Sequence, residues 1–204
     1  MPEATLKKYE PALKSLYAYF NANSGLTEDQ FKRIASFFTI RNFERRQIVV
    51  ETGQTDDYFN YILKGVARKY IITGKKEITL QLSTEGHFIH SELSFHTRKP
   101  SLCFVEAIEP CVFLSLHYDH LQQLYIDMPE LNKLGRLMTS QMYVRKELRD
   151  LSQIRLSTRE RFLQYIQRHP DMLQRVSQKY IASYLNIKPE TFSRLKHLLR
   201  IKAK

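Results

Sequence analysis

Cysteine and long apolar runs are scarce in this sequence, and their scarcity excludes several classes of protein. Cys103 and Cys111 are its two thiols, too few for a disulfide framework and without the paired spacing of a zinc or redox motif. We therefore expect two buried, reduced side chains. No run reaches 18 apolar residues, so we expect no membrane span. The polar N-terminus, MPEATLKKYE, has no signal-peptide core, which predicts a soluble cytoplasmic protein.

Acidic residues are scarce in the last quarter of the chain. Residues 155–204 hold 12 Lys/Arg and 3 Asp/Glu, whereas residues 1–154 hold 20 and 18. Most of the net charge of +11 therefore lies in the C-terminal region. A basic region of this kind favours polyanions, through counterion release and steered association.

A recognisable catalytic cluster is also lacking. We find no acidic triad, no Ser/His/Asp arrangement and no glycine loop that could cradle a phosphate. Glu106 and Glu109 lie on or beside a predicted strand, and we interpret them as surface charges. The sequence therefore predicts a protein that is not an enzyme.

Two helices precede a β-rich region. Apolar residues at helical spacing predict a helix over residues 6–23, beginning at Leu6. Thr27 and Gln30 form a capping box that predicts the start of a second helix. From Ile40 to about residue 116, short β-rich runs alternate with glycines, which favours an antiparallel sandwich or barrel with a hairpin tip at residues 74–76. The predicted strands cover residues 47–50, 58–63, 66–72, 77–82, 102–107 and 111–116.

Residues 128–153 predict one long helix. Two apolar series repeat every seven residues with an offset of three, which is typical of a coiled-coil seam. A second stripe, Leu131, Met138 and Met142, predicts contact with the chain's own β domain. An ordinary buried helix in a monomer is the alternative. In a homodimer, the seam residues facing the partner would be Leu134, Leu137, Gln141, Val144, Leu148 and Leu151.

Residues 176–200 have the pattern of two short helices joined by a tight turn. Apolar residues fall at helical spacing on both sides of residues 186–189. Asn186 tolerates the left-handed backbone that ends a helix, and Pro189 suits the first turn of the next. Small Ala182 would let the two helices approach closely. Because the second helix points polar side chains outward, we predict a helix-turn-helix that binds double-stranded DNA.

A β domain, a long helix and a small basic helix-turn-helix, in this order, resemble the Crp/Fnr family of bacterial transcription regulators. The resemblance covers about residues 40–200 and rests on VVETGQTDDYFNYILKGVARKY at 49–70, GHFIHSELSF at 86–95 and KPETFSRL at 188–195. The last segment has the glutamate, and three residues later the serine and arginine, of the Fnr-branch recognition helix. The resemblance implies an α+β fold: an antiparallel β-roll with flanking helices, a long dimerisation helix and a C-terminal winged helix-turn-helix.

The resemblance implies roles for the second helix of the C-terminal pair. Glu190, Ser193 and Arg194 match base-reading positions, where glutamate can accept from a cytosine amino group and arginine can bind guanine bidentately. An ion pair between Glu190 and Arg194 on an exposed helix is the alternative. Pro189 stands where cyclic-AMP-type members have another base-reading arginine, so readout there differs. Further expected DNA contacts are Lys188, Thr191, Gln178, Lys179 and Lys196.

The resemblance also implies an effector pocket in the β domain. Members that bind cyclic nucleotides use a glycine-glutamate pair for the ribose and an arginine-serine pair for the phosphate. Here Ser91 and Glu92 stand near the first pair, with a shift of one residue, and Ser101 and Leu102 stand at the second. The arginine is missing, so a cyclic phosphate would lack its bidentate partner. We therefore do not expect cyclic AMP to bind, and the effector is unknown.

Other cofactors of the family lack a clear ligand set. An Fnr-type iron–sulfur cluster needs several thiolates near the N-terminus, but the first 102 residues contain no cysteine, so we expect no cluster. His87 and His90 near Glu92 have no evident third partner, and we expect no metal site. Haem would draw on one of several imidazoles, among which the sequence selects none: His87, His90, His96, His117 and His120.

Together these patterns predict an effector domain at residues 1–126, a dimerisation helix at 127–154 and a DNA-binding domain at 155–204. The last boundary follows from a capping box formed by Ser157 and Glu160. We expect a homodimeric regulator that senses an effector and binds a pseudo-palindromic site, with RNA polymerase as a further partner. The alternative is a ligand-binding signalling module of the same fold with weak or lost DNA binding.

Overall fold

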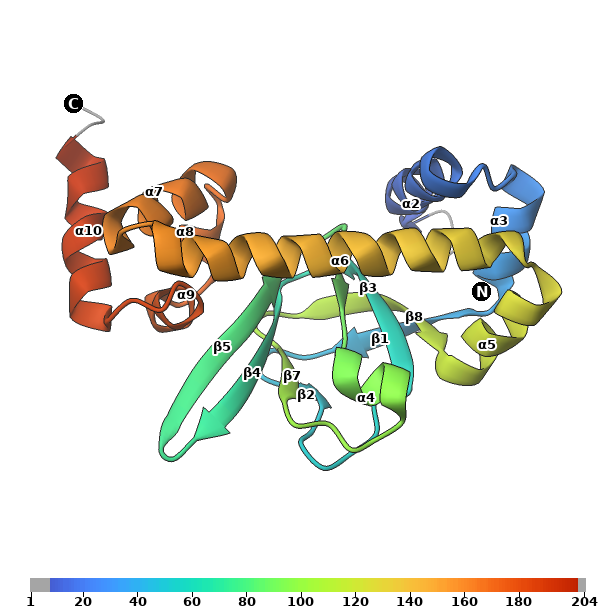
Figure 1. Ribbon diagram of the computed structural model, residues 1–204, viewed down its shortest axis with the longest axis horizontal. Coiled ribbons are helices and arrows are strands. Elements are labelled where there is room, and N and C mark those ends of the chain that lie inside the picture. The colour runs from blue at the N-terminus through green and yellow to red at the C-terminus, as the bar shows by residue number, and fades with distance from the viewer. Residues whose placement is uncertain (1–7, 202–204) are drawn as a thin grey trace.

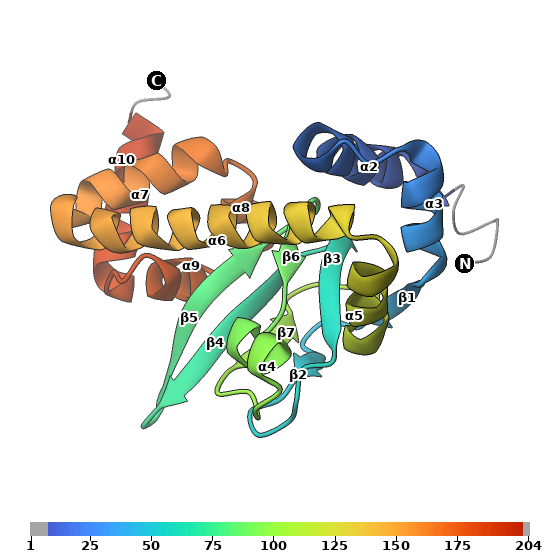
Figure 2. The ribbon, with the colours of Figure 1, turned by 45° about the vertical axis from the view of Figure 1, so that its right-hand side comes forward.

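One long helix, α6 (Glu130–Arg155), spans the molecule. The computed structural model describes residues 8–201 and the side chains of residues 8–196. In it, α6 lies across the β domain and joins a helical group near the N-terminus to a second helical group near the C-terminus (Figure 1). The turned view shows the same arrangement, with a long hairpin extending away from α6 (Figure 2). Within residues 8–201, no helix is long and apolar enough to cross a bilayer.

Two helices, α2 (Glu10–Ser24) and α3 (Glu28–Ser36), form the N-terminal group. The capping box of Thr27 and Gln30 is confirmed, whereas the expected start at Leu6 lies outside the described residues. Both helices pack against α5 (Tyr118–Asp127) and the first half of α6. Their shared apolar core includes Leu16, Phe20, Phe31, Ile34, Leu124, Leu131 and Leu134.

The β domain consists of two antiparallel four-stranded sheets, which confirms the expected architecture. One sheet has the order β1 (Phe38–Phe43), β8 (Cys111–His117), β3 (Tyr58–Lys64) and β6 (Phe88–Ile89). The other has the order β2 (Ile48–Val50), β7 (Phe104–Ala107), β4 (Ala67–Thr73) and β5 (Lys76–Ser83). Their facing side chains form a second core, which includes Phe43, Ile62, Ile89, Val105 and Phe113.

Three elements of the β domain were not predicted from the sequence: β1, β6 and the short helix α4 (Glu92–Thr97). Strand β1 begins two residues after α3 ends, so Phe38 continues the apolar face of that helix in the sequence pattern. Strand β6 has only two residues, too few to show an alternation. Its pairing depends on Asn60 and Tyr61 of β3, which are distant in sequence.

Four helices form the C-terminal group: α7 (Thr158–Arg168), α8 (Met172–Arg175), α9 (Gln178–Tyr184) and α10 (Pro189–Ile201). The capping box of Ser157 and Glu160 is confirmed. The expected wing is not, because the described residues 155–201 contain no strand. The segment after α7 forms α8, and the neighbouring β structure is instead the β4–β5 hairpin, which packs against α9.

The C-terminal helices share an apolar core with the β domain. Phe162, Ile181 and Phe192 pack in one cluster with Val66 and Ile108, which flank strands β4 and β7. The sequence predicted a separate region from residue 155 onward. In the structure, that region is fixed to the β domain through side chains.

Gly65 is the glycine that the sandwich can least replace. Its φ is +100°, and a Cβ there would lie 2.6 Å from Cys111 Sγ and 2.7 Å from the Pro110 carbonyl oxygen. Gly53 has a similar φ of +90°, but an added Cβ would meet nothing within 4 Å. The pair therefore separates backbone strain from steric clash.

We predict that Gly53→Ala lowers the free energy of unfolding by about 1–2 kcal/mol, the cost of a left-handed alanine. Gly65→Ala should cost at least about 2 kcal/mol more, because the neighbouring backbone must also move. Urea unfolding of both variants measures the difference. Equal losses of unfolding free energy in the two variants would show that the backbone at Pro110 and Cys111 can move aside at no cost.

Candidate nucleic-acid interface and effector pocket

The turn between α9 and α10 has the expected backbone geometry. Asn186 has a φ of +53°, in the left-handed region. The Ile187 N–H donates to the Ala182 carbonyl oxygen at 2.9 Å and closes the end of α9. Pro189 is the first residue of α10. Ala182 is buried, and Phe192 packs edge-on against Phe162 of α7 with ring centroids 5.1 Å apart.

Burial divides α10 into two faces. Phe192 and Leu195 are buried, whereas Glu190, Ser193 and Arg194 are exposed. No ion pair joins Glu190 to Arg194 among the described side chains, so the charge pairing considered as an alternative is not formed. The other predicted contact residues are also at the surface: Gln178, Lys179, Lys188 and Pro189 are exposed, and Thr191 and Lys196 are half-buried.

Helix α9 is fixed to the β4–β5 hairpin. The Thr79 N–H donates to Ser183 Oγ at 2.9 Å, and Ser183 Oγ in turn donates to the Glu77 carbonyl oxygen at 3.3 Å. Lys179 Nζ lies 3.8 Å from Glu77 Oε2. Arg149 of α6 donates to the carbonyl oxygens of Leu80 and Tyr184 and so ties α6 to the same junction.

Arg68 is the most buried charge at this junction. Its side chain is 2% exposed, and its guanidinium lies 3.9 Å from the ring centre of Tyr70 and 3.8 Å from that of Tyr180 in α9. It donates to Glu106 at 2.7 Å and to Glu77 at 2.8 Å. Burial alone would lower the pKa of Arg68, but these two carboxylates raise it above its ordinary value.

The interpretation of Glu106 and Glu109 as surface charges was wrong. Glu106 is buried with Arg68, and Glu109 is half-buried and pairs with Arg175 at 2.5 Å. Arg175 also pairs with Glu85 at 2.7 Å, and hydrogen bonds to Glu85 and then to Glu109 raise its pKa. Both carboxylates look solvated in the sequence, because the cations that cover them are distant along the chain: Arg68 is 38 residues from Glu106, and Arg175 is 66 residues from Glu109.

The predicted effector residues are only partly brought together. Ser101 Oγ donates to Ser91 Oγ at 2.9 Å and to the Cys103 carbonyl oxygen at 2.7 Å, all within the buried interior. Leu102 is 68% exposed and lies outside this cluster, because the chain alternates its side chains on entering β7. Both cysteines are free and buried, as predicted.

Glu92 is already paired. Its carboxylate accepts from Nζ of Lys69, a buried lysine of β4 that also donates to the His90 carbonyl oxygen at 3.3 Å. Burial would raise the pKa of Glu92, but Lys69 holds it below the ordinary value. The nearest arginine in sequence, Arg98, pairs with Asp57 and donates to the Asp56 carbonyl oxygen. The carboxylate nearest the predicted ribose position and the arginine nearest the predicted phosphate position are therefore each engaged in an ion pair within the protein.

His90 is the one histidine buried in the β domain among residues 8–196. Burial lowers its pKa to about 3, so the ring is neutral near pH 7. It lies among the rings of Phe59, Phe95 and His96, and the nearby Glu92 carboxylate opposes the effect of burial on its pKa only in part. The described residues contain no group of three side chains suited to a metal ion.

The seam predicted along α6 is buried within the chain in its first half and exposed in its second half. Leu134 is 2% exposed in the N-terminal core, and Gln141 accepts from Tyr19 at 2.8 Å and donates to Asn23 at 3.3 Å. Leu137 is half-buried. We had predicted that these residues face a second chain, whereas Leu134 and Gln141 contact the N-terminal helices of the same chain. A heptad pattern does not distinguish between these two partners. From residue 143 onward the apolar side chains are exposed: Tyr143, Val144, Leu148, Leu151 and Ile154.

We predict that Glu92→Gln lowers the free energy of unfolding by about 1–3 kcal/mol, because it leaves the buried Lys69 ammonium without its counter-charge. Lys69→Met in the Glu92→Gln background should recover most of the loss, since no unpaired charge then stays buried. Glu51→Gln, an exposed carboxylate on a neighbouring loop, is the matched control. An unchanged unfolding curve for Glu92→Gln would mean that Glu92 is free to bind a ligand.

Comparison with known proteins supports this architecture. Residues 40–127 match the cyclic nucleotide-binding domain family, and no curated protein matches the chain. The c-di-GMP-responsive global regulator CLP of Xanthomonas campestris has 16% identity and a TM-score of 0.67, over 87% of this chain and 93% of that one. FixK2 of Bradyrhizobium japonicum has 19% identity and a TM-score of 0.69, over 81% and 86% of the two chains.

A third similar structure is the catabolite activator protein of Thermus thermophilus, with 19% identity and a TM-score of 0.53 over 91% of this chain and 87% of that one. At these identities the likeness concerns the fold. It covers 81–91% of this chain in the three comparisons. The chain therefore contains a cyclic nucleotide-binding domain at residues 40–127 and shares its overall fold with known transcription regulators of this architecture.

Proposed function

We propose that this protein is a homodimeric, DNA-binding transcription regulator of the Crp/Fnr type. The observation that carries the proposal is the outer face of α10: Glu190, Ser193 and Arg194 are exposed there, without an ion-pair partner among the side chains of residues 8–196, while the inner face is buried. A free glutamate and a free arginine, one helical turn apart, can read a cytosine and a guanine in the major groove. The basic C-terminal region supplies the attraction to phosphate.

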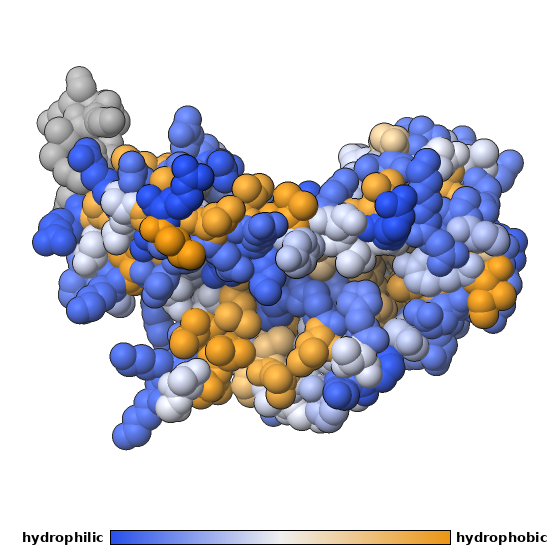
Figure 3. Space-filling view, viewed as in Figure 1, coloured by the Kyte–Doolittle hydropathy of each residue, from blue (hydrophilic) through white to orange (hydrophobic). Residues whose placement is uncertain are grey.

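Dimerisation rests on the second half of α6. Leu148 is 61% exposed and Ile154 is 83% exposed, on a helix that otherwise packs against its own chain. Apolar residues gather along this half of α6 in the surface view (Figure 3). Paired α6 helices would place two copies of α10 about 34 Å apart, the spacing of successive major grooves on one face of DNA. By analogy with Crp/Fnr regulators, we propose RNA polymerase as a further partner.

The effector is not cyclic AMP in this proposal. Lys69 neutralises the carboxylate that would bind a ribose, and Ser91 and Ser101 bond to each other. A ligand of other chemistry would have to displace or bridge these contacts. We also propose no catalytic role, since the charges buried in the β domain are engaged in structural ion pairs.

A ligand-binding signalling module without DNA binding is the second candidate. The match of residues 40–127 to the cyclic nucleotide-binding domain favours it, because that match covers the β domain and not the helix-turn-helix. Selection from random-sequence DNA at moderate salt decides between the two. A recovered two-fold site supports the regulator, and recovery of no preferred sequence overturns it.

We predict that Arg194→Ala relaxes the preference at one base position per half-site and weakens binding to the selected site by about 1–3 kcal/mol per half-site. Lys188→Ala, a matched loss of one positive charge at the start of α10, should weaken binding equally for all sequences. Titration of both variants against the selected site and its single-base variants measures this. If Arg194→Ala also weakened all sequences equally, Arg194 would contact only phosphate.

We predict that Leu148→Asp with Leu151→Asp converts the dimer to a monomer, because two carboxylates per chain would be buried at the seam. Leu102→Asp, at an exposed leucine outside α6, is the control and should stay dimeric. Light scattering after size-exclusion chromatography gives the mass. If the wild-type protein were a monomer at micromolar concentration, dimerisation through α6 would be refuted directly.

A further inference from the structure

Two lysines form the tip of the β4–β5 hairpin. Lys76 pairs in register with Thr73, and Gly74, with a φ of +62°, lets the chain reverse so that Lys75 projects at the end. Both lysines are exposed, and neither has a carboxylate within ion-pair distance among the described side chains. The other charges of the hairpin are engaged: Arg68 with Glu106 and Glu77, and Lys69 with Glu92. The tip therefore carries the net positive charge of the hairpin.

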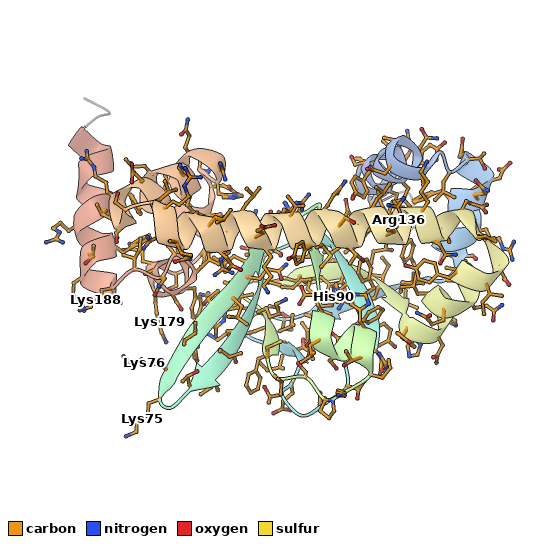
Figure 4. The ribbon with its side chains drawn as sticks, viewed as in Figure 1. Lys75, Lys76, His90, Arg136, Lys179 and Lys188 are labelled. Carbon is orange, nitrogen blue, oxygen red and sulfur yellow. The ribbon has the colours of Figure 1, made fainter. Side chains whose placement is uncertain are left out.

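The tip has a fixed position relative to α9. Glu77 and Thr79 bond to Ser183 and approach Lys179, all on the face of β5 nearest α9. Lys75 and Lys76 precede these residues by one to four positions. At about 3.3 Å per residue, Lys75 lies roughly 7 Å along the strand beyond Glu77, which contacts α9. Figure 4 shows Lys188, Lys179, Lys76 and Lys75 following one another along the same edge of the molecule.

This edge continues the surface assigned to DNA. In a helix-turn-helix the first helix crosses the phosphate backbone while the second enters the major groove. Lys179 and Gln178 open α9, so the backbone would pass beside them, and a step of about 7 Å spans roughly two further phosphates of one strand. We propose that Lys75 and Lys76 bind the phosphates flanking each half-site, an inference that rests on the proposed DNA-binding function.

A different role is open to any hairpin of this kind. Strand β5 is the edge of its sheet, and edge lysines prevent strand pairing between molecules. An acidic protein surface is another partner that two lysines could bind. The tie between Glu77 and Lys179 favours DNA, because it holds the tip beside the helix that approaches the backbone.

The test compares Lys75→Gln/Lys76→Gln with the wild-type chain on two duplexes. One duplex contains only the selected two-fold site, and the other adds about one helical turn of flanking DNA on each side. For the long duplex, the dimer of the variant should bind several-fold more weakly. Its slope of log K against log salt should fall in magnitude by about four, close to one counterion for each lysine removed. On the short duplex the two proteins should differ much less.

Lys133→Gln/Arg136→Gln is the matched control, since it removes two exposed positive charges from the first turns of α6. Figure 4 shows Arg136 far from the hairpin tip. It should keep both the long-duplex affinity and the salt slope. Equal binding by wild type and Lys75→Gln/Lys76→Gln on the long duplex would overturn the flanking contact while leaving the proposed function intact. Failure of the wild-type protein to bind either duplex would overturn the proposed function itself.

Discussion

The buried guanidinium of Arg68 is the interaction on which the arrangement of the two ends of this protein depends. It belongs to β4, and its partners come from β5, β7 and α9: Glu77, Glu106 and Tyr180. A buried charge that loses one partner costs several kcal/mol, and a desolvated cation on an aromatic face contributes about 2 kcal/mol. These elements must therefore keep their relative positions, and α10 is oriented by the β domain as well as by α6.

Arg68 also explains how a change in the β domain could reach the C-terminal helices. Successive side chains of a strand point to opposite faces. Arg68 therefore faces α9, while its neighbour Lys69 faces Glu92, one of the predicted effector residues. The β4–β5 register shifts between Lys69 and Tyr70, so the irregularity directly follows the residue that pairs with Glu92. A ligand that drew Glu92 away from Lys69 would act one residue from the Tyr180 contact. Arg149 gives a second route, from α6 to Tyr184.

The sequence predicted the elements whose signals are local. Six strands, the capping boxes at Thr27 and Ser157, the left-handed Asn186 and the two-faced α10 all follow from neighbouring residues. What it could not predict depends on distant partners. Glu106 was expected at the surface but is buried against Arg68. Leu134 was expected to face a partner chain but packs in the core that includes α2. Leu102 was expected in the effector pocket but is exposed, because side chains alternate in direction along the segment before β7. The same limit applies to Lys69, whose role depends on a glutamate 23 residues away.

Without a wing in the described residues 155–201, any DNA contact beyond α10 would have to come from another part of the protein. Residues 155–201 are helical between their turns, so the β structure nearest α9 is the β4–β5 hairpin of the effector domain. Contacts with Ser183 and Lys179 hold this hairpin against α9. Contacts made by its tip would then depend on the same Arg68 junction that orients α10. If the protein binds DNA as proposed, a change at Lys69 could affect that binding through β4, because this strand carries both Lys69 and Arg68 and leads into the hairpin tip.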